Sequence, residues 1–252
     1  MPTFLIDLDG VVYRGNTLIK GVPEAIARLR RLGSIYFLTN NSTLHRIKYV
    51  EKLRRIGIQT GINEIITSGF AAARYIAGNG GGRVLVIGEE GLIAELRDQS
   101  LDIVDDWRIA DYVCVGLDRS FNYEKLSRAF KAVTGGAVFI ATNRDVTLPL
   151  EGGLEPGAGA IVSSIEACTG REPILIGKPS TLILEETIGI PKGECIVVGD
   201  RFETDLALAR RIGARMAMVL TGATSLDDVE KCVDKPDIVL DSIAELPDYL
   251  GV

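Results

Sequence analysis

The chain has 252 residues, of which 46% are hydrophobic, so it can bury a substantial core and lies in length between one large domain and two smaller ones. Its formal net charge is −6 and its Lys and Arg residues are scattered, which argues against nucleic acid or an anionic membrane as a partner. Asp7 and Asp9 interrupt the first apolar run, and no run approaches the ~20 apolar residues of a membrane span, so we expect a soluble protein without a signal peptide.

The four cysteines lie far apart and show no Cys-x-x-Cys spacing, which indicates neither a zinc site nor a disulfide framework. Reduced thiols, and therefore the cytoplasm, are the predicted setting. Cys195 and Arg201 have the spacing of cysteine phosphatases, but Cys195 falls in a strand-like run and is expected to be buried and inert. His45, the single histidine, is expected at a solvated helix position, which gives Ser-His-Asp hydrolysis little support.

Strand-like apolar runs alternate with amphipathic helical stretches along nearly the whole chain, which is typical of parallel sheets with crossover helices. The first part predicts strands near 3–7, 35–39 and 64–67, and helices near 23–32, 43–57 and 69–77. Residues 78–82 then form the strongest glycine cluster. A phosphate-binding loop would follow a strand and open a helix, whereas this cluster precedes a strand, so a hinge or linker is predicted.

A second α/β pattern follows this hinge. It predicts strands near 83–88, 101–104, 112–116 and 137–142, and helices near 90–98, 122–134 and 158–169. After a turn at 171–173 the first pattern resumes, with strands near 195–199, 215–220 and 237–240, and helices near 180–189, 203–212 and 242–249. The simplest interpretation is a doubly wound parallel-sheet core domain, residues 1–79 and 173–252, interrupted by an inserted α/β domain, residues 80–172.

Two carboxylates follow the first predicted strand at its carboxyl end. Asp7 and Asp9 are two residues apart, so in an extended segment both point to the same side, and Gly10 lets the backbone turn away after them. Open α/β sheets place their chemistry at this edge. One carboxylate can attack a substrate while its neighbour moves a proton. A capped turn or a fragment of a Ca²⁺ loop is the alternative interpretation.

The second predicted strand ends in four consecutive small polar residues, Thr39, Asn40, Asn41 and Ser42. Their side chains, together with the free N–H groups at the start of a following helix, suit phosphate oxygens. An ordinary helix N-cap also favours Asn and Ser. A cap needs one such residue, so four of them favour an anion site.

A third strand-like run leads directly into acids, with Asp200 at its end and Asp205 within the next helical turn. Both can therefore lie at the same sheet edge as Asp7, although a surface loop with a capping acid would also fit. Lys178 lies between a strand-like run and a helix. Such a lysine is usually a solvated surface charge, but among several carboxylates it would balance their charge and hold a phosphate.

In this order, these motifs resemble the four motifs of the haloacid dehalogenase-like superfamily: Asp7-x-Asp9-Gly10, Thr39-Asn40-Asn41, Lys178, and Gly199-Asp200 followed by Asp205. The chain is further similar to the NagD-like, 4-nitrophenylphosphatase branch of that superfamily. The segments that carry this similarity span nearly the whole chain and lie at 10–15, 39–42, 142–145, 156–159 and 177–180. The large cap domain of the branch matches the insertion predicted at 80–172.

The resemblance implies a role for each acid. Asp7 is the expected nucleophile, which forms an aspartyl-phosphate, and Asp9 is expected to protonate the leaving oxygen and later to activate water. Carboxylate oxygens and a phosphate favour Mg²⁺ as the cofactor. The implied metal ligands are Asp7, the main-chain carbonyl of Asp9, and Asp200. Asp205 is expected to reach the metal through water or to orient Lys178.

The resemblance also implies the residues that bind the substrate. Thr39, Asn40 and Lys178 are expected to hold the transferring phosphoryl group, with Asn41 supporting or extending that set. In the family a loop of the cap, residues 141–150 here, projects over the active site, which makes Arg144, Asp145 and Leu148 candidates for substrate contacts. A tight turn with Arg144 and Asp145 paired on the surface is the alternative. Relatives that prefer pyridoxal phosphate carry a His where this chain has Leu148, which argues against that substrate.

The predicted function is therefore a Mg²⁺-dependent phosphomonoesterase of small phosphorylated metabolites in the cytoplasm. A phosphotransferase or mutase on the same scaffold is the nearest alternative, and a receiver-like phospho-Asp switch is a second one from a different class. A switch would need neither a second acid at Asp9 nor an insertion of ~90 residues. The sequence leaves the oligomeric state open, although relatives often associate through the cap, which would give a homodimer.

Overall fold

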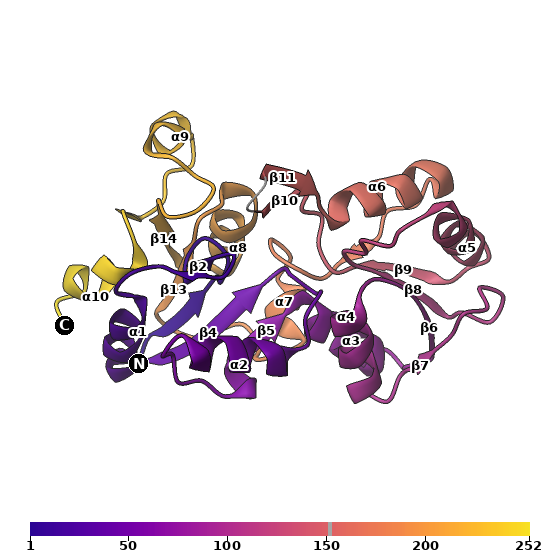
Figure 1. The fold of residues 1–252 in the computed structure, drawn as a ribbon, viewed down its shortest axis with the longest axis horizontal. Helices are drawn as coiled ribbons and strands as arrows, with labels where there is room; N and C mark the ends of the chain where they lie inside the picture. Colours follow the sequence, from indigo (N-terminus) through magenta and orange to yellow (C-terminus); the bar gives the residue numbers. More distant parts are fainter. Residues whose placement is uncertain (151–152) are drawn as a thin grey trace. The chain divides into compact units, whose positions relative to one another are not determined.

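The computed structural model describes residues 1–150 and 153–252, which form two compact units. Each unit contains a parallel sheet with flanking helices (Figure 1), which confirms the predicted α/β class. The predicted domain bounds, 1–79 with 173–252 and 80–172, differ from the bounds of these units and stay a prediction. The first unit contains Met1–Thr39, Tyr49–Ile66 and Ile190–Val252, and the second contains Asn40–Lys48 and Thr67–Gly189.

The sheet of the first unit has six strands and is wound outward from β1 in both directions. The chain first adds β4 and β5 on one side, and later adds β13, β14 and β15 on the other side, which is the doubly wound arrangement. In spatial order the strands are β15 (Ile238–Leu240), β14 (Arg215–Val219), β13 (Cys195–Gly199), β1 (Thr3–Ile6), β4 (Ser34–Thr39) and β5 (Ile65–Thr67).

The register of the central strands fixes where the chemistry can lie. β1 pairs in parallel with both β13 and β4, and Ile6 lies opposite Val198 and Phe37. The residues that follow these strands therefore lie at one carboxyl edge. The winding direction changes between β1 and β13, and such a switch point is where open α/β sheets bind ligands.

Helices, short turns and a small hairpin complete the first unit. The hairpin follows β1 directly, and one of its residues, Tyr13, is buried in the core with Phe4, Ile6 and Val198. The bounds are β2 (Tyr13–Arg14), β3 (Thr17–Leu18), α1 (Val22–Leu32), α2 (Arg46–Arg55, which begins in the second unit), η1 (Ile62–Glu64), η2 (Phe202–Leu206), α8 (Ala207–Ile212), α9 (Leu226–Lys231), η3 (Ile243–Glu245) and α10 (Leu246–Tyr249).

The second unit has its own five-stranded parallel sheet and its own apolar core, which includes Val113, Val115, Phe139 and Val162. An antiparallel hairpin, β10 with β11, lies outside that sheet. The sheet order is β12 (Ile174–Leu175), β9 (Val138–Ala141), β8 (Tyr112–Val115), β6 (Arg83–Ile87) and β7 (Asp102–Ile103). The remaining elements are α3 (Ser68–Gly78), α4 (Glu90–Asp98), α5 (Tyr123–Thr134), β10 (Thr147–Leu150), β11 (Gly153–Pro156), α6 (Ala158–Thr169) and α7 (Leu182–Glu185).

Two predicted helices are shorter than expected. The helix predicted over 43–57 begins only at Arg46, because the Asn41 side chain accepts hydrogen bonds from the N–H and hydroxyl of Thr43 and holds that segment in a turn. The helix predicted over 180–189 is confined to α7, and Gly189 ends the following turns with a positive φ of 75°. Within the described part of the chain, no helix is both long and apolar enough to cross a membrane.

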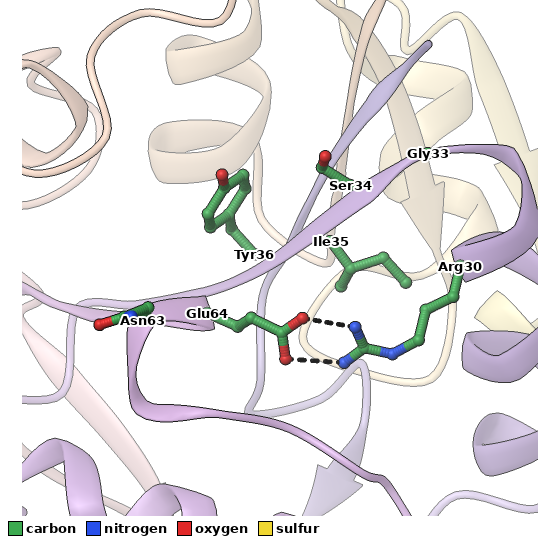
Figure 2. A pocket seen from close by; sticks show the side chains of 7 residues that line it. All are labelled: Arg30, Gly33, Ser34, Ile35, Tyr36, Asn63 and Glu64. Carbon is green, nitrogen blue, oxygen red and sulfur yellow. Dashed lines mark hydrogen bonds and ion pairs between the residues drawn. The ribbon is translucent and has the colours of Figure 1, made fainter.

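A hollow of about 440 Å³ lies at the opposite edge of the first sheet, where β4 begins (Figure 2). Arg30 and Glu64 form a two-fold ion pair beside it. Burial acts to raise the pKa of the Glu64 carboxyl, but hydrogen bonds from Arg30 and Thr60 lower it overall. Since this edge carries the amino ends of the strands, the hollow is not a candidate for the catalytic site. Its lining residues are Arg30, Gly33, Ser34, Ile35, Tyr36, Asn63 and Glu64.

Tyr13→Phe should leave the melting temperature unchanged or raise it. The Tyr13 side chain is 1% exposed, and among the described residues its hydroxyl has no hydrogen-bond partner. Burying an unsatisfied hydroxyl costs about 1–3 kcal/mol, so its removal is not destabilising. Tyr112→Phe is the matched control, because it deletes a hydroxyl that donates to the Asn79 carbonyl at 3.0 Å and should cost about 1 kcal/mol. Thermal unfolding of both variants measures their melting temperatures, and a Tyr13→Phe variant with a lower melting temperature than the wild type would contradict the prediction.

Candidate active site

Three acids meet at the carboxyl edge of the first sheet. Asp7 directly follows β1, Asp200 directly follows β13, and Asp205 lies in the π-helical turn η2. Each offers a carboxylate oxygen, and these oxygens all lie within 4.8 Å of one another. Asp200 and Asp205 are buried and Asp7 is half-buried. The sequence predicted that these strand ends meet, and the structure brings them together.

Two main-chain N–H groups and one hydroxyl group donate hydrogen bonds to the two buried acids of this cluster. Asp200 Oδ2 accepts a hydrogen bond from the N–H of Ala223 at 2.6 Å, and the carbonyl of Asp200 accepts one from Thr224 Oγ1 at 2.6 Å. Asp205 Oδ2 accepts a hydrogen bond from the N–H of Arg201 at 3.2 Å. The two N–H groups orient the carboxylates, and the Thr224 hydroxyl holds the backbone of Asp200.

Glycines allow the backbone to approach these carboxylates closely. A Cβ on Gly222 would overlap Asp200 Oδ2, and a Cβ on Gly10 would lie 2.5 Å from the same oxygen. Gly10 also has a positive φ of 85°, which L side chains rarely adopt. A Cβ on Gly199 would overlap the carboxyl group of Asp205. Side chains at these three glycine positions would therefore occupy the space of the Asp200 and Asp205 carboxyl groups, and glycine leaves that cradle open.

The donor set of this cradle fits a hard divalent cation. All three groups supply oxygen, and neither His nor Cys takes part in this cluster. Oxygen ligands select Mg²⁺ or Ca²⁺ over softer metals. Three carboxylates this close also repel one another unless a cation offsets their charge. The chemistry and the spacing of the residues are consistent with the predicted Mg²⁺ ligands.

Asp9 lies next to two buried tyrosines. The pKa values of Tyr13 and Tyr49 are raised well above the usual value. Burial is the largest cause for both, the negative charge of Asp9 is the second, and the charge of Asp7 makes a smaller contribution. The Tyr49 hydroxyl is hydrogen-bonded to the side chain of Thr39, so this predicted phosphate ligand lies in the same neighbourhood. The first unit thus holds Asp7, Asp9 and Thr39 around one edge.

The sequence predicted no role for Tyr13 or Tyr49, although Tyr13 lies in the 10–15 segment that carries the family similarity. Tyr13 follows Asp9 by four residues and pairs with it through the backbone, which is a local signal that could have been used. Tyr49 comes from α2, and its approach to Thr39 depends on tertiary packing alone. Lys52 Nζ lies 3.3 Å from the centre of the Tyr13 ring and donates to the Gly15 carbonyl at 2.9 Å.

In the second unit, one amide joins two of the predicted site residues. Asn40 Nδ2 lies 3.0 Å from the main-chain oxygen of Lys178 and 3.2 Å from Asp145 Oδ1. Asn40 and Lys178 are buried and Asp145 is half-buried. The structure therefore brings together a residue after β4, a residue of the 141–150 loop and the predicted phosphate lysine.

The remaining predicted substrate residues have other surroundings. Arg144 forms an ion pair with Glu166 of α6. Leu148 is half-buried and lies opposite Glu155 in the hairpin of β10 and β11. Asn41 accepts the two hydrogen bonds from Thr43 that shape the turn before α2.

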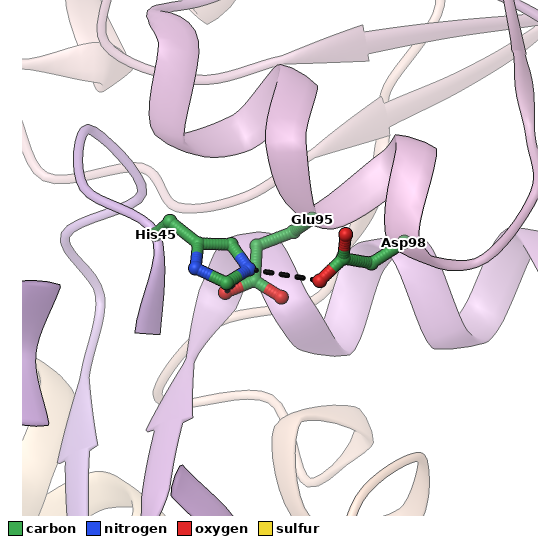
Figure 3. Close-up of side chains that lie close together, drawn as sticks. All are labelled: His45, Glu95 and Asp98. Carbon is green, nitrogen blue, oxygen red and sulfur yellow. Dashed lines mark hydrogen bonds and ion pairs between the residues drawn. The ribbon is translucent and has the colours of Figure 1, made fainter. Parts of the chain in front are cut away.

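His45, Glu95 and Asp98 form a second group of possible ligands (Figure 3), and His45 is not the solvated helix residue that the sequence predicted. It precedes α2, and its Nε2 lies 3.0 Å from Asp98 Oδ2. The N–H of Ile47 donates to His45 Nδ1 at 3.2 Å, so in the neutral ring Nε2 carries the proton. Glu95 already accepts from Arg46 Nε at 3.0 Å. These bonds suit a structural network better than a metal site.

Comparison with known proteins gives a consistent result over nearly the whole chain. A family model described as haloacid dehalogenase-like hydrolase matches residues 4–102, and a second, described as HAD-hydrolase-like, matches residues 175–246. The sugar phosphatase AraL of Bacillus subtilis is 38% identical over 248 residues, which cover 96% of this chain and 90% of the relative.

Solved structures of phosphatases are similar to this fold. A p-nitrophenyl phosphatase from Archaeoglobus fulgidus has a TM-score of 0.92 and 37% identity, and the match covers 98% of each chain. A glycerol phosphate phosphatase from Mycobacterium tuberculosis, solved in complex with magnesium, has a TM-score of 0.87 and 32% identity. That match covers 97% of this chain and 75% of the other.

Glu95→Ala should destabilise the protein by about 3–5 kcal/mol, because it leaves the charge of Arg46 uncompensated in a buried setting. The Glu95 side chain is 1% exposed and that of Arg46 is 10% exposed. Glu90→Ala on the same helix removes an exposed partner of Arg97 and should change stability little. Urea unfolding of both variants provides the comparison, and equal effects would show that burial of the pair is unimportant.

Proposed function

The chain belongs to the haloacid dehalogenase-like hydrolases and is a phosphatase of that family, and we propose that it is a Mg²⁺-dependent phosphomonoesterase of small phosphorylated metabolites that works through an aspartyl-phosphate. The observation that carries this proposal is the meeting of Asp7, Asp200 and Asp205 within 4.8 Å at the switch point of the sheet. A nucleophile and a cation site at one strand edge are what phosphoryl transfer to a carboxylate requires.

The proposed reaction has two steps. A carboxylate oxygen of Asp7 attacks phosphorus, the bond from phosphorus to the ester oxygen breaks, and Asp9 gives its proton to the departing alcohol. Water then attacks phosphorus of the aspartyl-phosphate, Asp9 takes a proton from that water, and inorganic phosphate leaves as the Asp7 carboxylate is restored. Asp9 thus acts as acid and then as base.

Asp7, the main-chain carbonyl of Asp9, and Asp200 would hold Mg²⁺, with Asp205 reaching it through water or orienting Lys178. When bound, Mg²⁺ offsets the negative charge of the phosphate and of the acids, so that Asp7 can approach phosphorus. The all-oxygen donor set supports this assignment. The magnesium complex of the Mycobacterium tuberculosis relative supports it as well.

In this proposal Thr39, Asn40 and Lys178 surround the transferring phosphoryl group, and Asn41 supports these three residues. A lysine ammonium compensates charge that develops on the phosphoryl oxygens. The burial of Lys178 strengthens such an interaction, because little water screens it. Its role stays a proposal together with those of Arg144, Asp145 and Leu148 at the substrate.

Sugar phosphates and related polyol phosphates are the substrate class that we propose. The AraL relative is named a sugar phosphatase, and the Mycobacterium tuberculosis relative is named a glycerol phosphate phosphatase. Asp145 supports this class, since a carboxylate accepts hydrogen bonds from hydroxyl groups and repels a second anionic group. We also propose that the enzyme works in the cytoplasm, where its scattered cysteines stay reduced.

The purified protein should release 4-nitrophenol from 4-nitrophenyl phosphate in the presence of Mg²⁺, and EDTA should abolish this release. Asp7→Asn should remove turnover while the fold is retained, because an amide oxygen is a poor nucleophile. Absorbance measures the product, and circular dichroism checks the fold. Asp118→Asn is the matched control, since Asp118 pairs with Lys125 and Ser120 of the second unit and should retain activity. Full activity of Asp7→Asn would overturn the proposed nucleophile.

Hydrolysis and phosphotransfer give different products from the same mixture. With 4-nitrophenyl phosphate and an excess of a free sugar, a phosphomonoesterase should release one inorganic phosphate for each 4-nitrophenol. A phosphotransferase would instead release less phosphate than 4-nitrophenol and form a sugar phosphate. Ratios of kcat/KM for glycerol phosphate, hexose phosphates and phosphoglycolate then test the substrate class, and a preference for phosphoglycolate would contradict it.

A further inference from the structure

We propose that Asn40 is a positioning residue, whose side-chain amide ties Lys178 to Asp145 instead of donating its own hydrogens to the phosphoryl group. This inference rests on the proposed function, in which Lys178 contacts the phosphoryl group. In this inference Asn40 acts on the reaction through Lys178 and Asp145. The loop at 141–150 and the lysine that contacts the phosphoryl group are then both held by the Asn40 amide.

Both hydrogens of the Asn40 amide nitrogen are engaged. The Lys178 carbonyl lies 3.0 Å from Nδ2, and the two Asp145 carboxylate oxygens lie 3.2 and 3.4 Å from it. An amide nitrogen carries two donor hydrogens, so each partner takes one. Turning the amide by ~180° would place Oδ1 against a carbonyl and a carboxylate, which are both acceptors, and the partners therefore fix its orientation.

The backbone of Asn40 is held as firmly as its side chain. Its carbonyl accepts hydrogen bonds from Ser68 Oγ at 2.6 Å and from Asn143 Nδ2 at 2.8 Å. Asn143 Oδ1 accepts from the N–H of Asp145 at 3.0 Å. The 143–145 segment thus binds Asn40 at two points, once through its carbonyl and once through its amide.

The segment that carries Lys178 approaches Asn40 closely because residue 177 is a glycine. A Cβ at Gly177 would lie 2.5 Å from Asn40 Oδ1 and closer still to the Thr142 carbonyl. The N–H of Gly177 donates to that same carbonyl at 2.9 Å. Asn40 is 6% exposed and Lys178 is 4% exposed, so water competes little for these bonds. A shift of either segment therefore moves the other.

A double-mutant cycle on Asn40 and Asp145 tests this link. Asn40→Ala and Asp145→Ala should each lower kcat/KM for 4-nitrophenyl phosphate by about tenfold, and the double variant should fall no further than the worse single one, because both changes break the same hydrogen bond. If Asn40 and Asp145 acted independently, the two losses would multiply, and kcat/KM of the double variant would fall by about a hundredfold. Such multiplication would overturn the proposal.

A swap of the two side chains separates this bond from general damage to the fold. Asn40→Asp sets a carboxylate against Asp145 and against the Lys178 carbonyl, so activity should fall further than in Asn40→Ala. Adding Asp145→Asn restores an amide that donates to a carboxylate and should recover part of the lost kcat. No recovery would overturn the pairing. Asn122→Ala is the matched control, since it removes an Asn that caps α5 and should leave kcat unchanged.

The free energy of unfolding of the same variants shows whether a negative result contradicts the inference about Asn40 or the proposed function. A wild-type protein that is inert toward phosphomonoesters would overturn the proposed function and the catalytic part of this inference. Coupling between Asn40 and Asp145 in stability would in that case still establish the link itself. Active wild-type protein with no coupling in either measurement would overturn only the inference.

Discussion

Repulsion among carboxylates at one sheet edge is the constraint on which the rest of this site depends. Asp7, Asp200 and Asp205 approach within 4.8 Å, and burial of the last two removes the water that would screen them. Main-chain N–H groups of Ala223 and Arg201 offset part of this charge. The negative charge that these N–H groups do not offset favours binding of a cation at this edge. The stability of the fold and the proposed chemistry therefore depend on the same charges.

The parts of the molecule that follow from local sequence patterns could be predicted. Apolar strand-like runs placed β1, β4 and β13, and their carboxyl ends placed Asp7, Thr39 and Asp200, because parallel strands share an edge. The fold class and the family were confirmed on this basis. The assigned roles of the individual site residues come from the resemblance of the motifs and stay predictions.

Features that tertiary packing creates could not be predicted. The strands of the β2–β3 hairpin have two residues each, too few to show a strand period, and Pro149 and Pro156 in the β10–β11 hairpin argue against a strand. Tyr49 reaches Thr39 only through the packing of α2. The engagement of both Asn40 hydrogens likewise depends on residues more than a hundred positions away. The missed helix α9 is different, because Ser225 and Asp228 form a capping box that a closer search of the sequence could have found.

The π-helical turn η2 has a consequence for how this chain can change in length. The N–H of Leu206 reaches back five residues to the Arg201 carbonyl, so this turn contains one residue more than an α-helical turn. Losing one residue here would convert the π turn into an α-helical turn, so the change would be taken up within the turn, and the buried side of α8, with Leu208 and Ala209, would keep its direction. Losing one residue inside α8 would instead rotate everything beyond it by about 100° about the helix axis. The turn is therefore the place where this helical segment can shorten by one residue, and Asp205, which lies in it, is the site acid that such a change would move.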